Sequence, residues 1–211
     1  MNENHLKAIK ASIKAGDAIM EIYQEDFDVE YKDDASPLTQ ADKNANAVIM
    51  SYLETTSIPI ISEENKEIDY SERKSWTKCW IVDPLDGTKE FVKKNGEFTV
   101  NIALIDQQKP VFGVIYVPAQ RLLYVGDVEA KQAFKVAVSE DDSDIVSLLE
   151  KTSTLRPSKN SNPLRVVGSR SHMNQDTLDY VDGLKDKYQK PVEIVSKGSS
   201  LKFCLVAEGE A

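Results

Sequence analysis

The stretch Cys79-Trp80-Ile81-Val82-Asp83-Pro84-Leu85-Asp86-Gly87-Thr88 decides the fold and marks the place where a site is expected. Its first four residues form a continuous apolar run, which is typical of a buried strand, and Asp83 stands where that run ends. Pro84 fixes one backbone angle and Gly87 permits a turn or a close backbone approach. The sequence therefore predicts a buried strand that delivers two carboxylates, Asp83 and Asp86, to a turn at its end.

Two carboxylates that converge across such a turn are suited to a hard cation. Mg²⁺ takes oxygen ligands from carboxylates, backbone carbonyls and water. The backbone N–H groups of Gly87 and Thr88 are expected to point into the same space, where a phosphate oxygen can sit. Composition alone leaves an ordinary polar turn after a buried strand as the alternative.

A second apolar run, residues 58–62, leads into Glu63 and Glu64. If this strand neighbours the run that ends at Asp83, Glu63 and Asp83 emerge at the same edge of a sheet. Carboxylates gathered at one edge repel each other, and cations between them relieve that repulsion. This is the physical reason to expect a metal, although Glu63 and Glu64 taken alone resemble ordinary surface residues.

The remaining chain alternates helical and strand patterns. Apolar residues follow the 3.6-residue period in two N-terminal segments, which predicts amphipathic helices at 5–24 and 39–54. Short turns separate the β-rich segments 98–105, 111–117, 121–125 and 134–138, a spacing that favours antiparallel neighbours. The last part predicts a strand, a helix, a strand and a helix, at 165–167, 174–188, 192–195 and 198–206. This order predicts an α/β layered fold with a mixed, mainly antiparallel sheet.

The predicted organisation has three parts. Residues 1–140 form an N-terminal α+β portion that contains the metal site. Residues 141–163 are acidic and then polar, and are predicted to connect it to a smaller α/β portion that starts at residue 164 and runs to 211.

The composition of the chain limits the kinds of partner and the cellular location that are expected. The net charge of −9 argues against a nucleic-acid polymer, whose phosphates need a basic face. An anionic small molecule then needs local positive charge, which bound metal ions can supply. Cys79 and Cys204 are expected to be reduced, buried thiols, and the chain shows no signal peptide or transmembrane run. The expected location is the cytoplasm, with peripheral association with the inner membrane left open.

Glu63-Glu64 followed by residues 80–88 resembles the inositol monophosphatase superfamily, whose members are Mg²⁺-dependent, lithium-sensitive phosphomonoesterases. Longer runs are more specifically similar to the bacterial 3'(2'),5'-bisphosphate nucleotidases. These enzymes hydrolyse adenosine 3',5'-bisphosphate to AMP and phosphate. The similar runs are residues 83–91, 95–106, 169–172 and 198–209. The similarity spans most of residues 8–211. It implies a layered α-β-α-β-α sandwich, Mg²⁺ as cofactor and a small phosphorylated nucleotide as substrate.

The resemblance also implies roles for individual residues. The metal ligands are Glu63, Asp83, the backbone carbonyl of Leu85, and Asp86. Asp83 bridges two ions and Asp86 binds the second. Gly87 and Thr88 cradle the phosphate, and Glu63, Leu85 and Asp86 line the substrate as well. The run 39–42 matches a Thr-x-Ala-Asp pattern, so that Asp42 acts with Thr88 to orient and deprotonate the attacking water, without a covalent intermediate.

A further set resembles the part of the family that contacts the nucleotide. It consists of Gly198, Ser199, Ser200 and Lys202, at a predicted helix start where an anion is favoured. A helix start with a solvent-exposed lysine is the alternative. His172 either approaches the substrate or lies on the surface, and Lys32 matches a basic position of the superfamily near the site.

The sequence departs from the superfamily in one signature. A Trp-Asp pair, whose Asp completes the second metal site, is expected downstream of the helix that Gly198 opens. The tryptophans here are Trp76 and Trp80, neither precedes an Asp, and the sequence stops at Ala211. We expect a fragment of a longer polypeptide with one metal site largely intact, the second incomplete, and low or absent activity. A truncated gene, or a remainder supplied separately, is the alternative.

Three functions therefore compete. The leading hypothesis is hydrolysis of adenosine 3',5'-bisphosphate. An inositol phosphate or sugar phosphate phosphatase would share the metal site without the nucleotide contacts. A catalytically impaired protein that binds nucleotide or metal is the third alternative, and the oligomeric state stays open.

Overall fold

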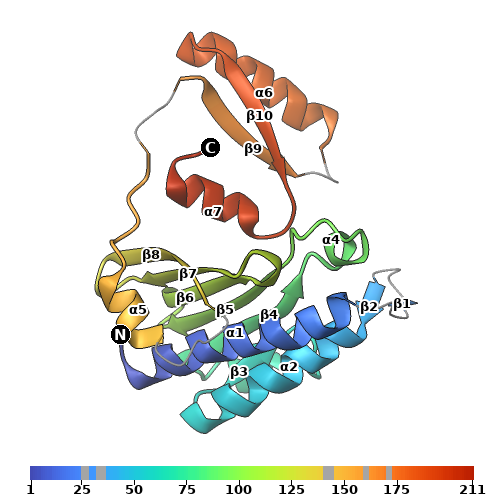
Figure 1. Ribbon diagram of the computed structural model, residues 1–211, viewed down its shortest axis with the longest axis vertical. Coiled ribbons are helices and arrows are strands. Elements are labelled where there is room, and N and C mark those ends of the chain that lie inside the picture. Colours follow the sequence, from blue (N-terminus) through green and yellow to red (C-terminus); the bar gives the residue numbers. More distant parts are fainter. Residues whose placement is uncertain (25–28, 32–36, 140–144, 159–161, 170–172) are drawn as a thin grey trace. The chain divides into compact units, whose positions relative to one another are not determined.

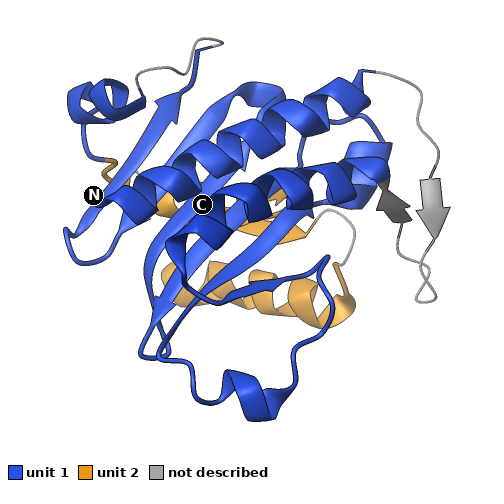
Figure 2. Ribbon diagram, turned by 90° about the horizontal axis from the view of Figure 1, so that it is seen from below, with its two compact units in different colours: residues 1–154 blue, residues 155–211 orange. Residues whose placement is uncertain are grey.

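The computed structural model describes residues 1–24, 29–31, 37–139, 145–158, 162–169 and 173–211. Contacts within the chain divide it into two compact units, Met1–Thr154 and Leu155–Ala211, coloured separately in Figure 2. The division falls within the segment 141–163. A helix that the sequence did not predict, α5 (Ile145–Lys151), lies in the same segment and belongs to the first unit.

A six-stranded sheet is the frame of the first unit, with strand order β3-β4-β5-β6-β7-β8 (Figure 1). Its strands are β3 (Ile60–Ser62), β4 (Lys78–Asp86), β5 (Thr99–Asp106), β6 (Lys109–Val117), β7 (Leu122–Asp127) and β8 (Gln132–Ala137). β3 runs parallel to β4, and all the other neighbouring pairs are antiparallel. The prediction of a mixed, mainly antiparallel sheet is confirmed.

Two N-terminal helices lie side by side over one face of this sheet (Figures 1 and 2). They are α1 (Glu3–Tyr23) and α2 (Gln40–Leu53), close to the two predicted helices. Their apolar stripes are buried against alternate strand residues, as the hydrophobic periods of helix and strand require. Gly16 permits the close approach of α1 to β6, because a Cβ at this position would lie 2.4 Å from Cε1 of Tyr116.

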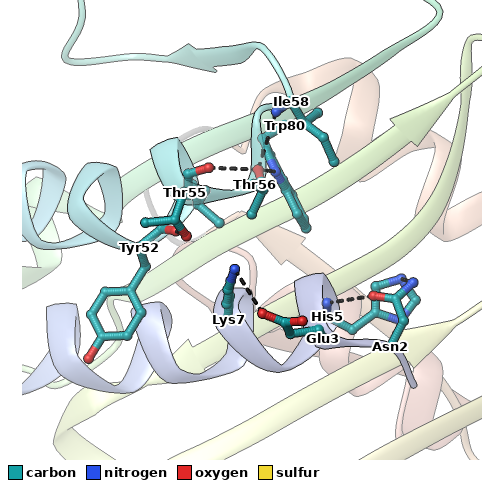
Figure 3. A network of polar contacts seen from close by, with 10 residues as sticks. Asn2, Glu3, His5, Lys7, Tyr52, Thr55, Thr56, Ile58 and Trp80 are labelled. Atoms are coloured by element: carbon teal, nitrogen blue, oxygen red, sulfur yellow. Dashed lines mark hydrogen bonds and ion pairs between the residues drawn. The ribbon is translucent and has the colours of Figure 1, made fainter.

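Trp80, the third residue of β4, connects this strand to the turn that follows α2. Its side chain is fully buried, and its indole N–H donates a hydrogen bond of 3.0 Å to Oγ1 of Thr56 (Figure 3). Thr56 ends the 3₁₀ turn η1 (Glu54–Thr56), and its hydroxyl donates to the carbonyl of Leu53 at 2.6 Å. This connection joins the start of β4 to the C-terminal end of α2.

Smaller elements complete the first unit. They are β1 (Val29–Tyr31), which pairs antiparallel with β2 (Pro37–Thr39), and α3 (Tyr70–Arg73), α4 (Thr88–Val92) and η2 (Pro118–Gln120). Among the helices of the described residues, none is both long enough and apolar enough to cross a membrane.

The second unit has the predicted order of strand, helix, strand and helix. Its elements are β9 (Leu164–Ser169), α6 (Gln175–Tyr188), β10 (Val192–Lys197) and α7 (Leu201–Glu208). β9 and β10 form a parallel pair, which requires a crossover such as the one that α6 provides. Among its described residues, the buried apolar side chains are Val181, Leu184, Leu201 and Cys204.

Candidate active site

β4 continues through the stretch that the sequence predicted as a turn. Asp83 pairs with Asn101 and Asp86 pairs with Thr99, so three steps along β4 face two steps along β5. This irregularity is a β-bulge, which accommodates one extra residue in one strand. The prediction of a turn that begins at Asp83 is wrong, because Pro84 and the residue after it are buried in the strand and the bulge absorbs them.

The bulge brings the two carboxylates to the same face of the sheet. Side chains alternate along a regular strand, so residues three apart would point to opposite faces. With one extra residue inserted, Asp83 and Asp86 both lie on the face that carries Asn101 and Thr99. The side chains of these two partners contact each other there, with Nδ2 of Asn101 donating to Oγ1 of Thr99 at 3.2 Å.

Gly87 makes the turn that follows. Its backbone lies in the left-handed region, with φ 95° and ψ 42°, which favours glycine. Thr88 is the first residue of α4 and is half-buried. The predicted turn therefore exists one step after Asp86, and it starts a short helix that the sequence did not predict.

Glu63 leaves the sheet beside Asp83. β3 is parallel to β4 with Ser62 opposite Val82, and the backbone N–H of Glu63 donates to the carbonyl of Val82 at 3.2 Å. The expected neighbouring of these two strands is confirmed. The Glu63 side chain is exposed and that of Glu64 is half-buried.

Asp42 lies in the first turn of α2 and is buried, with 5% of its surface exposed. It belongs to a group of acids that act on Asp83. The pKa of Asp83 is raised from 3.8 to about 8, first by burial and then by the negative charges of Asp86, Glu63 and Asp42. A hydrogen bond from the backbone N–H of Leu85 acts in the opposite direction.

One oxygen of Asp83 has no partner of its own. Its Oδ1 is buried and accepts no hydrogen bond from any described residue. A buried acceptor without a donor is costly, and so is a carboxylate among like charges; a hard cation would offset both costs. The oxygen-rich surroundings fit Mg²⁺ in particular.

The fit has a geometric limit. Within the part of the chain that the structure describes, no three His, Cys, Asp or Glu side chains converge closely enough to hold an ion by themselves. An ion beside Asp83 would therefore take part of its shell from waters and backbone carbonyls. Mg²⁺ characteristically retains several waters and uses one or two carboxylates.

The predicted nucleotide-contacting residues lie in the second unit. Gly198 is buried, and Ser199 has a left-handed φ of 54°. Lys202 is half-buried, and its Nζ donates to the carbonyl of Ser199 at 2.6 Å. The lysine is thus held at the start of α7 and does not extend freely into solvent. His172 and Lys32 lie outside the described residues.

The remaining site-related expectations have mixed outcomes. Cys79 and Cys204 are free thiols; Cys204 is buried as expected, and Cys79 is half-buried.

Thr99 and Asn101 lie on the face of the two carboxylates, and the sequence did not predict them as residues of the site. Polar residues that alternate with the buried Phe98, Val100 and Ile102 were the available signal.

The sequence model of the inositol monophosphatase family matches residues 1–211 of the chain. The chain belongs to the inositol monophosphatase family. Its relatives include the "3'(2'),5'-bisphosphate nucleotidase CysQ" of Salmonella typhimurium, 44% identical over 201 residues that cover 93% of this chain and 74% of the relative. The corresponding protein of Shigella flexneri is 42% identical over the same shares of the two chains.

Solved structures of the inositol monophosphatase family share the fold. CysQ from Bacteroides thetaiotaomicron, described as a bacterial member of this family, is 44% identical with a TM-score of 0.85, and the match covers 99% of this chain and 77% of that one. The family comprises phosphatases, so the bulged strand end with its acidic residues belongs to a phosphatase fold. The α/β layered architecture expected from the sequence is the architecture of the family.

Proposed function

We propose that this protein is a Mg²⁺-dependent phosphomonoesterase that hydrolyses adenosine 3',5'-bisphosphate to AMP and phosphate. The observation that carries the metal-dependent chemistry is Asp83, a half-buried carboxylate with a raised pKa and a buried, unpartnered oxygen among three other acids. The choice of substrate is supported by relatives that carry the name 3'(2'),5'-bisphosphate nucleotidase and are 42–44% identical over 93% of the chain.

Four residues would hold the cofactor. They are Glu63, Asp83, Asp86 and, through its backbone carbonyl, Leu85. Bound Mg²⁺ would supply a water of lowered pKa and neutralise charge on the phosphate. β3 and β4 position these residues at one sheet edge, and the bulge gives both aspartates of β4 the same direction.

Asp42 and Thr88 would prepare the attacking water. Both stand in the first turn of a helix, α2 and α4 respectively, next to the acidic edge. The Thr88 hydroxyl can donate to Asp42 while it accepts from the water, which aligns the water and gives its proton a path to a carboxylate. Burial of Asp42 keeps bulk water from competing for this contact.

The substrate contacts that we propose follow the resemblance to the family. The backbone N–H groups of Gly87 and Thr88 would bind the transferred phosphate, which Glu63, Leu85 and Asp86 would line. By the same resemblance, Gly198, Ser199 and Lys202 would contact the nucleotide, with the Lys202 ammonium supplying a positive charge for its second phosphate.

Phosphate release tests the proposal on the full chain. Adenosine 3',5'-bisphosphate and inositol 1-phosphate are compared, each with Mg²⁺ and with a chelator. We expect that any release comes from the nucleotide and occurs only with Mg²⁺, with AMP as the end product. Preference for inositol 1-phosphate would overturn the substrate assignment. Nucleotide binding without release would identify a binding protein and overturn hydrolysis.

A further inference from the structure

One side-chain amide bonds to both sides of the turn that carries Glu63. Asn46 lies on α2, four residues after Asp42 and therefore on the same helix face. Its Oδ1 accepts a hydrogen bond of 2.7 Å from the hydroxyl of Ser62, and its Nδ2 donates one of 2.8 Å to Oδ1 of Asn65. Ser62 comes directly before Glu63, and Asn65 follows two residues after it.

The turn itself is closed around Ser62. The hydroxyl of Ser62 is also the acceptor for the backbone N–H of Glu64 at 3.4 Å, and its carbonyl accepts from the N–H of Asn65 at 3.2 Å. Ser62 is buried, with 8% of its surface exposed. The contacts of Asn46 thus join a locally closed turn to the helix of Asp42.

The turn also borders a cavity. Ser62, Glu63 and Asn65 line a cavity of about 230 Å³ that extends to Arg73 of α3. The Glu63 side chain is exposed, and its negative charge lies close enough to Asp83 to raise the pKa of that carboxyl. The hydrogen bonds of Asn46 hold the residues before and after Glu63 against α2.

We propose that Asn46 is a positioning residue, which holds the Glu63 turn against the helix of Asp42 and so presets the Mg²⁺ site. The inference rests on the proposed function, because it concerns the same metal. An amide suits the position, since it accepts from Ser62 and donates to Asn65 at once. Aspartate would lose the donor and add a further charge to an acidic edge.

The test measures Mg²⁺ binding to the full chain by calorimetry, together with the Mg²⁺ concentration for half-maximal phosphate release and kcat at saturating Mg²⁺. Asn46→Ala is expected to weaken Mg²⁺ binding about tenfold, as loss of outer-shell partners generally does. Its kcat at saturating Mg²⁺ should stay within about twofold, because the cation restores the position of Glu63.

The matched control is Asn44→Ala on the same helix. Asn44 is exposed and accepts a bond of 2.9 Å from Nε2 of Gln40, away from the turn, so its loss should leave Mg²⁺ binding unchanged. Ser62→Ala serves as a second variant should Asn46→Ala unfold, and the double variant should bind Mg²⁺ no more weakly than the worse single one.

The outcomes separate the two proposals. Unchanged Mg²⁺ binding in folded Asn46→Ala or Ser62→Ala overturns the positioning role, as does an equal loss in Asn44→Ala. Mg²⁺ binding by the wild type without hydrolysis overturns the proposed function alone, since calorimetry still compares the variants. A wild type that binds no Mg²⁺ overturns both.

Discussion

The two opposite ends of the six-stranded sheet each carry an aspartate, and the two are in opposite surroundings. Asp127 ends β7 and is buried: its Oδ1 accepts from the N–H of Ala130 at 2.9 Å, and its Oδ2 lies 3.5 Å from Nδ1 of His5. Asp83, near the end of β4, is half-buried, has a buried oxygen without a hydrogen-bond donor, and lies among other acids. The neighbouring groups therefore distinguish the two aspartates.

We infer that the difference separates a structural carboxylate, Asp127, from one that binds a ligand, Asp83. His5 stacks on Phe112 with ring centroids 4.0 Å apart, so the contact with Asp127 attaches the first turn of α1 to the sheet. Asp83 accepts a backbone hydrogen bond from Leu85, but its charged neighbours are acids and its Oδ1 has no donor among the described residues. A fold retains such a cost where a ligand offsets it, which is why strongly perturbed carboxylates indicate sites.

Asp83→Asn gives the largest expected effect and tests the functional side of the comparison. Phosphate release should fall about 1,000-fold or more, because the amide cannot supply the negative charge that holds the metal. The metal-free variant should be more stable than the metal-free wild type near pH 7, because the wild type must bind a proton at Asp83 when it folds and the amide need not. Steady-state kinetics and urea unfolding with a chelator measure the two effects; retained activity would remove Asp83 from the site.

The pH dependence of stability sharpens the same contrast. Between its ordinary pKa of 3.8 and about 8, folded Asp83 holds a proton that the unfolded chain has lost. The free energy of unfolding of the metal-free protein should therefore fall as pH rises, by up to about 1.4 kcal/mol per pH unit. Adding Mg²⁺, or making the substitution Asp83→Asn, should remove this contribution of Asp83 to the pH dependence of stability. Urea unfolding from pH 5 to 8 checks it, and identical slopes in wild type and Asp83→Asn would contradict the assignment.

Asp127→Ala tests the structural side. The change removes the acceptor of the Ala130 N–H and the partner of His5, so the free energy of unfolding should fall by about 1–3 kcal/mol. Activity of the folded enzyme at saturating Mg²⁺ should stay within about twofold. Asp106→Ala is the matched control, because its ion pair with Lys78 is partly exposed and contributes at most about 1 kcal/mol. A large loss of kcat in Asp127→Ala with stability intact would break the comparison.

The long periodic elements of this fold could be predicted from the sequence, and the irregular ones could not. α1 and α2 carry several turns of apolar stripe, and buried residues alternate along most of β5 to β8. α4 has 5 residues and α5 has 7, which is too short for a period to show. The bulge in β4 depends on its register with β5, a tertiary property that no local pattern reports.

The candidate site follows the same division. The meeting of Glu63 and Asp83 could be predicted, because parallel neighbouring strands bring their ends to one edge. Asp42 was reached through family resemblance, since a helix-start aspartate is ordinary by itself. Asn46 and Ser62 carry no sequence signal, because their roles arise from contacts between α2 and β3.

His5→Gln gives the smallest expected effect and examines the partner of Asp127. Burial lowers the pKa of His5 below 6.5; the N-terminal ammonium also lowers it, while Asp127 and Glu129 raise it. Below pH 6.5 the unfolded chain therefore binds a proton that the folded chain does not, and stability falls as pH falls, by less than about 1.4 kcal/mol per pH unit.

The contribution of Asp83 to the pH dependence of stability has the opposite sign. The comparison should therefore be made between the Asp83→Asn variant and the same variant with His5→Gln added. Urea unfolding at pH 5 to 7 should then show a shallower acid slope with His5→Gln, while any slope from His172 cancels. An unchanged slope would mean that His5 is protonated in the folded protein and that its contact with Asp127 is an ion pair.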